Sequence, residues 1–87
     1  MKLKLKGSEV DAGTSSTNGS YVGLAKLVQV HNAGDTARLV SLETSTAALI
    51  GTFTIGANAT ELLDKEPTDE IFAAHADVLL VGIAYYS

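Results

Sequence analysis

Apolar residues occupy consecutive positions in the C-terminal stretch, residues 78–86 (VLLVGIAYY), which contains no charged residue. A strand with one face in water would alternate apolar and polar side chains. This stretch is apolar on both alternating faces. It therefore predicts a strand that is covered on both sides and around which the rest of the chain is organised.

Strict alternation marks residues 2–6, where Leu3 and Leu5 share one face and three lysines share the other. The pattern predicts a short strand with one wet face, and lysines suit an edge strand because they discourage further pairing. The alternative is a cationic arm that docks on an acidic neighbour.

Further strands are predicted where alternation resumes between turn signals. Residues 32–35 (NAGD) form a strong turn signal and predict a hairpin, and Gly56 begins another turn. In the third predicted strand, Leu49, Phe53 and Ile55 are expected to face inward. The predicted strands are residues 21–31, 38–44, 49–55 and 60–65.

Residues 68–76 follow a turn at Pro67 and fit two structures. Pro67 could start a helix, or residues 70–73 could form a strand. Because residues 68–76 could be a helix or a strand, the predicted number of strands is six to seven, separated by turns. The sequence thus predicts an all-β fold, a single small antiparallel β-sandwich or barrel-like domain.

Residues 7–20 are rich in Gly, Ser, Thr, Asn and Asp, and only Val10 is strongly apolar. A connection of this length in a small domain is usually functional or disordered. We expect an N-terminal edge strand and flexible arm over residues 1–20, ordered on contact with a partner, and a β-sandwich domain over residues 21–87. The glycines lack the following lysine of a phosphate-binding loop.

The chain has 87 residues and no cysteine, so neither disulfides nor thiolate metal sites can supplement a small core. Oligomerisation remains as the supplement, and we expect self-association. The net charge is −4, but three of the six basic residues lie at positions 2–6, which leaves −7 for residues 7–87. An acidic body argues against direct nucleic-acid binding. Without an apolar secretion signal or a span of membrane length, we expect a soluble protein made in a cytoplasm.

Candidate chemistry is sparse. His31 and His75 have no histidine or cysteine at ligand spacing, and the carboxylates around Pro67 are typical of a solvated turn. We therefore expect no enzymatic activity, no cofactor and no bound metal.

An interface is a better prediction for the aromatic residues. Tyr85 and Tyr86 are adjacent in a predicted strand, so they point to opposite faces and only one can enter the chain's own core. Tyrosine is enriched in interfaces. The predicted interface residues are Leu3, Leu5, Tyr21, Leu79, Val81, Ile83, Tyr85 and Tyr86.

Several segments carry a resemblance to a known group of proteins. They are VHNAG at residues 30–34, GTFTI at 51–55, LDKEPTDEI at 63–71 and the final apolar strand ending in Ala84-Tyr85. Over about residues 28–86 the chain resembles small all-β accessory proteins, decoration, cement or tail-associated, in virions of tailed phages of marine bacteria. The comparable segment in that group is extended, which favours a strand at residues 70–73.

The resemblance implies a structural protein located in the virion and assembled in the host cytoplasm. Its expected partners are the phage major capsid protein, other virion proteins and further copies of itself, and its expected role is to decorate or cement the capsid. The alternatives are a tail or head–tail junction component, or a small β-sandwich module that binds a ligand such as a glycan. No membrane partner is expected.

Overall fold

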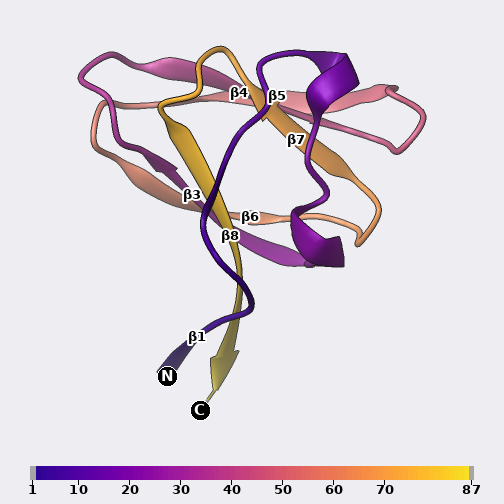
Figure 1. Ribbon diagram of the computed structural model, residues 1–87, viewed down its shortest axis with the longest axis vertical. Helices are drawn as coiled ribbons and strands as arrows, with labels where there is room; N and C mark the ends of the chain where they lie inside the picture. The colour runs from indigo at the N-terminus through magenta and orange to yellow at the C-terminus, as the bar shows by residue number, and fades with distance from the viewer. Residues whose placement is uncertain (1, 87) are drawn as a thin grey trace.

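The computed structural model describes residues 2–86, with the side chains of Lys2, Leu3, Thr17, Tyr85 and Tyr86 left out of the description. Its strands form two antiparallel sheets (Figure 1). The larger sheet has the order β1-β8-β3-β6, with β2 also paired to β8, and the smaller sheet has the order β5-β4-β7. The strands are β1 (Lys2–Leu5), β2 (Val10–Asp11), β3 (Leu27–Asn32), β4 (Arg38–Glu43), β5 (Leu49–Ile55), β6 (Thr60–Asp64), β7 (Glu70–Ala73) and β8 (Val78–Tyr86).

One apolar core lies between the two sheets. Alternate residues of β3 and β8 point into it from the larger sheet, and alternate residues of β4 and β7 do so from the smaller one. The fully buried members are Val28, Val30, Val40, Ile55, Ile71, Ala73, Val78 and Leu80. The predicted all-β, antiparallel class is confirmed. The predicted count of six to seven strands is not confirmed, because residues 2–86 form eight, and neither sheet closes into a barrel within this range.

The segment expected to be an arm, residues 7–20, lies along one side of both sheets. Val10 and Asp11 of β2 pair with Leu80 and Leu79 of β8, while Gly13 and Ser20 pair with β7. Strand pairing therefore runs across the expected domain boundary at residue 20. Backbone hydrogen bonds dominate these contacts, which explains why a polar, glycine-rich composition is compatible with them. The mobility of this segment in solution stays a prediction.

The strand predicted over residues 21–31 begins only at Leu27. The hairpin predicted around residues 32–35 is wrong, because β3 pairs with β6 and β8 whereas β4 belongs to the other sheet. Before β3, the residues Val22, Gly23 and Leu24 all have positive φ angles, of 53°, 62° and 63°. This conformation costs roughly 1–2 kcal/mol per residue for side chains other than glycine. The turn is held by Ser20, whose Oγ accepts a hydrogen bond from the Val22 amide, and by contact of Val22 with the core.

The inward orientation predicted for Leu49 is wrong, because β5 contains a β-bulge. Leu42 pairs with Gly51, but Glu43 pairs with Leu49, so Ile50 is an extra residue without a partner on β4. An inserted residue reverses the faces that follow it along the strand. Leu49 consequently lies on the outer face and is 65% exposed.

The open question at residues 68–76 is resolved in favour of a strand. Residues of β7 pair antiparallel with β4, from Val40 opposite Ala73 to Glu43 opposite Glu70. Within residues 2–86 the structure contains only short 3-10 turns besides strands, so it has no helix of the length and apolarity needed to cross a membrane.

Candidate interaction surfaces

The outer face of the larger sheet, which is turned away from the core, brings together four of the eight residues predicted to form an interface. Leu5 pairs with Ile83. Directly opposed residues of antiparallel strands point to the same face. Leu79 and Val81 alternate with the core residue Leu80, so they lie on this face as well.

These residues differ in how far they are available to a partner. Val81 and Ile83 are only 4% and 2% exposed, so this chain already covers them, and Leu79 is half-buried. Leu5, by contrast, is 61% exposed. Leu62 of β6, opposite Gln29, is a further exposed leucine on this face that the sequence did not single out.

The other residues predicted to form an interface are Tyr21 and three residues near the chain termini. Tyr21 is exposed and follows Ser20, at the edge of the smaller sheet. Leu3, Tyr85 and Tyr86 have their backbones in β1 and β8, but their side chains are outside the described part of the chain. The interface role of the whole set stays a prediction.

The two chain termini form a two-stranded ribbon that extends beyond the body of the protein (Figure 1). It consists of β1 and the last residues of β8, from Ile83 onward, and the Lys6 amide donates a hydrogen bond to the Gly82 carbonyl at its base. Two isolated strands are marginally stable in water. The ribbon is therefore a part of the molecule that contact with another subunit would stabilise.

The outer face of the smaller sheet carries two separate exposed leucines. Leu39 of β4 lies opposite Thr54, Leu49 of β5 lies opposite Glu43, and each is about half exposed or more. Sequence reasoning missed the exposure of Leu49 because it depends on the bulge, which turns this side chain outward. The consecutive apolar residues Ala48, Leu49 and Ile50 interrupt the alternation and were the available signal.

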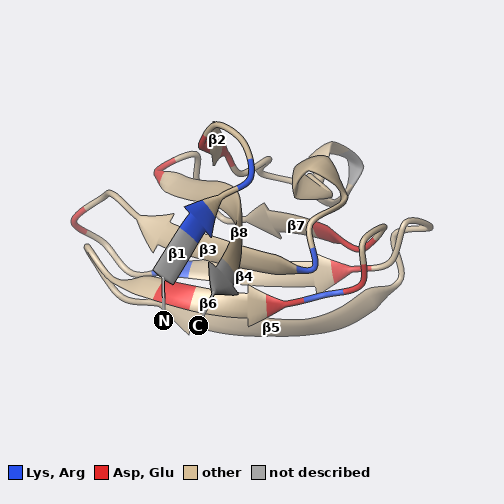
Figure 2. Ribbon diagram, turned by 90° about the horizontal axis from the view of Figure 1, so that it is seen from below, with Lys and Arg blue, Asp and Glu red and all other residues tan. Residues whose placement is uncertain are grey.

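The edges of the two sheets differ in charge. On one side of the molecule, residues 7–20 pair with the edges of β8 and β7, whereas β5 and β6 end their sheets on the other. The strand β6 carries Glu61 and Asp64, whereas residues 44–60, including all of β5, contain no charged residue. Figure 2 shows the uncharged β5 near the charged β6. An unprotected edge of this kind is a template for pairing with another chain.

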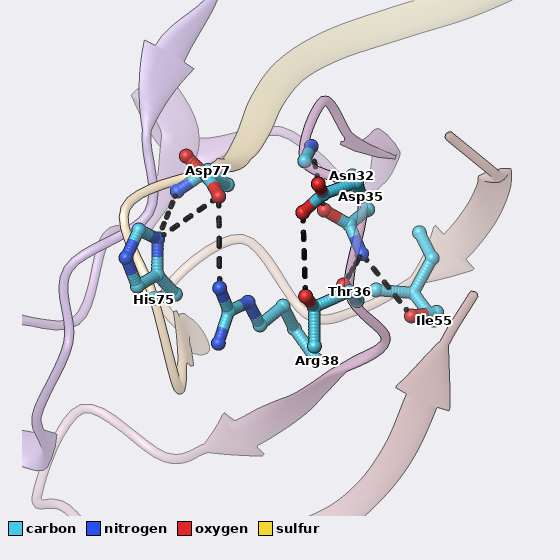
Figure 3. A network of polar contacts seen from close by, with 8 residues as sticks. Asn32, Asp35, Thr36, Arg38, Ile55, His75 and Asp77 are labelled. Carbon is cyan, nitrogen blue, oxygen red and sulfur yellow. Dashed lines mark hydrogen bonds and ion pairs between the residues drawn. The ribbon is translucent and has the colours of Figure 1, made fainter. Parts of the chain in front are cut away.

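A polar network joins the loop after β3 to the loop before β8 (Figure 3). Asn32 is fully buried at its centre, and its Nδ2 donates to the carbonyls of Thr36 at 2.8 Å and Ile55 at 3.3 Å. Its Oδ1 accepts from the Gly34 amide at 3.0 Å. All of the amide group's partners belong to the backbone, which indicates a role in fixing the loop rather than in chemistry.

His75 lies beside the same network, with Nδ1 3.3 Å from Oδ2 of Asp77. The Asp77 amide also points at Nδ1, at 3.0 Å. One ring nitrogen cannot accept from the amide and donate to the carboxylate at once, so the two contacts require different hydrogen positions on the ring. His31, on β3, contacts the hydroxyl of Thr60 at 2.8 Å.

Lys65 is buried at the open side of the molecule, where its Nζ donates to the carbonyls of Glu66 and Pro67. Burial lowers the pKa of Lys65 from its ordinary value, and the negative charge of Asp69 opposes this effect. The adjoining open groove is lined by Lys26, Leu42, Ile50, Asp64, Glu66 and Asp69 beside Lys65, none of them aromatic. Such a lining offers no ring on which a sugar could stack.

In the described part of the chain, no three His, Cys, Asp or Glu side chains come together as a metal-binding group. Comparisons with protein-family models, with curated proteins and with solved structures found no match to this chain. The similarity to accessory proteins of phage virions therefore stays a prediction from the sequence.

Proposed function

We propose that this chain is a non-enzymatic structural protein of a tailed-phage virion that decorates or cements the capsid. In this proposal the two-layered body is a small β-sandwich that joins neighbouring subunits edge to edge. The location in a virion depends on the resemblance of residues 28–86 to phage accessory proteins. The mode of assembly depends on the surfaces described above.

The observation that carries the proposal is the open edge of β5. The backbone groups of β5 that point away from β4 line a seven-residue strand without a charge or a proline, the Ile55 carbonyl alone being bonded to Asn32 among the described side chains, and the exposed Leu49 and Ile50 lie at one end. Strand addition at such an edge supplies affinity through main-chain hydrogen bonds, while side chains select the partner.

A second copy of this chain is the partner that fits β5 best. Two β5 strands would pair without bringing charges together, because residues 44–60 are neutral. Pairing of two β6 strands would instead place Glu61 and Asp64 of one copy near the same carboxylates of the other. Like charges directly opposed across strands are destabilising, so β6 is protected from self-pairing.

The terminal ribbon supplies a second kind of contact. It projects from the body and carries the exposed Leu5 (Figure 1). Laid across a neighbouring subunit, it would bury apolar surface worth roughly 1.5–3 kcal/mol for each large side chain that becomes fully covered. The edge and the ribbon together give each copy more than one neighbour, as a cementing protein requires.

The edge contact is tested by adding charge to β5. Thr52 and Thr54 are exposed on this strand, so lysines at both positions should block pairing without disturbing the core. Sedimentation velocity of Thr52→Lys/Thr54→Lys should show monomers at micromolar concentrations at which the wild type is oligomeric.

A control variant carries the same added charge outside the strand. Ser45→Lys/Ala57→Lys places two lysines at exposed positions in the turns that flank β5. This control should remain oligomeric. A wild type that is monomeric, or a β5 variant that assembles as the control does, would contradict edge pairing.

A further inference from the structure

The larger sheet ends in two strands whose charges are opposite. On one edge, Lys4 of β1 and Lys6 directly after this strand are exposed. On the other edge, β6 carries the exposed carboxylates of Glu61 and Asp64. The order β1-β8-β3-β6 places β8 and β3 between them, and Figure 2 shows blue on β1 and red on β6. One sheet thus has a basic edge and an acidic edge.

The edge of β1 that faces away from β8 pairs with no other strand of residues 2–86. The Lys6 amide donates to the Gly82 carbonyl, which makes these two a hydrogen-bonded pair. Such pairs alternate along antiparallel strands, so Leu5 and Ile83 are a non-hydrogen-bonded pair. The amide and carbonyl of Leu5 therefore point away from β8, and its side chain is 61% exposed on the outer face.

The edge of β6 that faces away from β3 has the same arrangement. The Asn32 amide donates to the Ala59 carbonyl, and the alternation from this pair makes Glu61 and Leu63 the residues of β6 that are hydrogen-bonded to β3. The amide and carbonyl of Leu62 consequently point to the open side. Its side chain is 48% exposed on the outer face of the sheet.

We infer that β1 of one copy adds to the open edge of β6 in a second copy, so that the larger sheets of neighbouring copies become continuous. An antiparallel register that places Leu5 opposite Leu62 of the second copy also places Lys6 opposite Glu61. The contact joins two exposed leucines on the outer face and two opposite charges on the other face. Cross-strand pairs of opposite charge stabilise a sheet, and covering the leucines adds apolar burial.

Charge distinguishes this pairing from the alternatives. Pairing of β1 with a second β1 would bring lysines together, and pairing of two β6 strands would bring carboxylates together. Like charges opposed across strands are destabilising, so neither of these two edges pairs well with itself. The neutral β5 can meet its own copy. The charge of each edge thus assigns its partner.

The contact is head-to-tail, because β1 and β6 are opposite edges of the sheet. Contacts of this type continue from copy to copy into a ring or filament, whereas pairing of β5 with itself joins two copies only. The inference rests on the proposed assembly from copies of this chain, but not on its place in a virion. Because β1 has four residues and β5 has seven, we expect the contact at higher concentrations than the β5 contact.

The test is sedimentation velocity of the full chain at submillimolar concentration, where the wild type should form species larger than a dimer. Lys6→Glu opposes two carboxylates in the contact, and Glu61→Lys opposes two lysines. Each variant alone should associate through this contact about tenfold more weakly. An equimolar mixture should recover the larger species, because the reversed β1 of one variant then meets the reversed β6 of the other.

Asp35→Lys is the matched control for Glu61→Lys, since Asp35 is exposed in the loop after β3. Leu62→Ser should also weaken the contact, whereas Leu39→Ser changes an exposed leucine of the smaller sheet and should not. The inference is overturned if the mixture stays as small as the separate variants, or if Leu62→Ser assembles as Leu39→Ser does. A wild type that stops at dimers would overturn it and leave pairing of β5 intact, whereas a monomeric wild type would contradict both.

Discussion

Replacement of Asn32 tests whether the buried network in Figure 3 holds the loop after β3 in place. Asn32→Ala removes three hydrogen bonds, two donated by Nδ2 to the Thr36 and Ile55 carbonyls and one accepted from the Gly34 amide. Each buried group left without a partner costs about 1–3 kcal/mol. The Thr36 and Gly34 groups are near the surface and can recover water, so we expect a total loss of about 2–4 kcal/mol.

Asn32→Asp separates hydrogen bonding from packing, because the two side chains have nearly the same shape. A carboxylate can still accept from Gly34, but it places a negative charge against two carbonyl oxygens. The free energy of unfolding should fall at least as far as in Asn32→Ala at neutral pH. Acidification should restore part of it, since the folded state favours the protonated acid and stability then decreases as pH rises.

Urea unfolding followed by circular dichroism measures these differences by linear extrapolation. A domain of this size is typically stable by about 5–15 kcal/mol, so the expected loss is a large fraction of the total. Thr36→Ala is the control, because it removes only an exposed hydroxyl that contacts Asp35 at 3.3 Å. The reasoning is refuted if Asn32→Ala costs no more than the control, or if Asn32→Asp matches the wild type at neutral pH.

Two further predictions concern the lysines. Burial lowers the pKa of Lys65 in the folded chain below its ordinary value of 10.5. Between these two pKa values the unfolded chain holds more protons than the folded chain, so Lys65 makes the free energy of unfolding increase with pH. Urea unfolding over this pH range should show the increase in the wild type and not in Lys65→Met or Lys65→Arg, and an increase of the same size in both variants would contradict the prediction. In a particle-binding assay, Leu3→Ser/Leu5→Ser should abolish binding, whereas Lys2→Gln/Lys4→Gln/Lys6→Gln should weaken it only modestly, because exposed ion pairs contribute about 0–1 kcal/mol each. The opposite ranking would identify residues 2–6 as a cationic tether.

Sequence patterns predicted those elements whose two faces differ or whose apolar character is continuous. The alternation of Val28 and Val30 with Gln29 and His31 gave the central strand, and the apolar run at residues 78–86 gave β8. In both strands the polarity of a side chain indicates whether the face on which it lies is buried or exposed. The antiparallel class follows from several such strands separated by turns.

Features that depend on backbone contacts between distant segments were not predicted. The pairing of Val10 with Leu80 and of Ser20 with Ile71 uses main-chain groups that every residue has. The left-handed turn at residues 22–24 contradicts the local preference of valine and is held by Ser20 and the core. A bulge is one inserted residue, and its position at Ile50 depends on how β5 meets β4.

Some residues of the candidate interaction surfaces were also predicted from the sequence pattern, and others were not. The apolar residues of β1 and β8 were recognised from their pattern, and the register brings Leu5 opposite Ile83. The burial of Val81 and Ile83 agrees with the prediction that both faces of residues 78–86 are covered, but the pattern could not show that this chain itself covers them. Leu62 of β6 was not singled out, although it is exposed on the outer face of the larger sheet.

The proposed function implies that this chain is a component of phage particles, and its copy number and position in purified particles test that proposal most directly. Quantitative mass spectrometry should find it in a fixed ratio to the major capsid protein, and cryo-electron microscopy should place it on the outer shell between capsid subunits. Absence of the chain from purified particles, or its presence only in the soluble fraction of infected cells, would contradict a structural role in the virion.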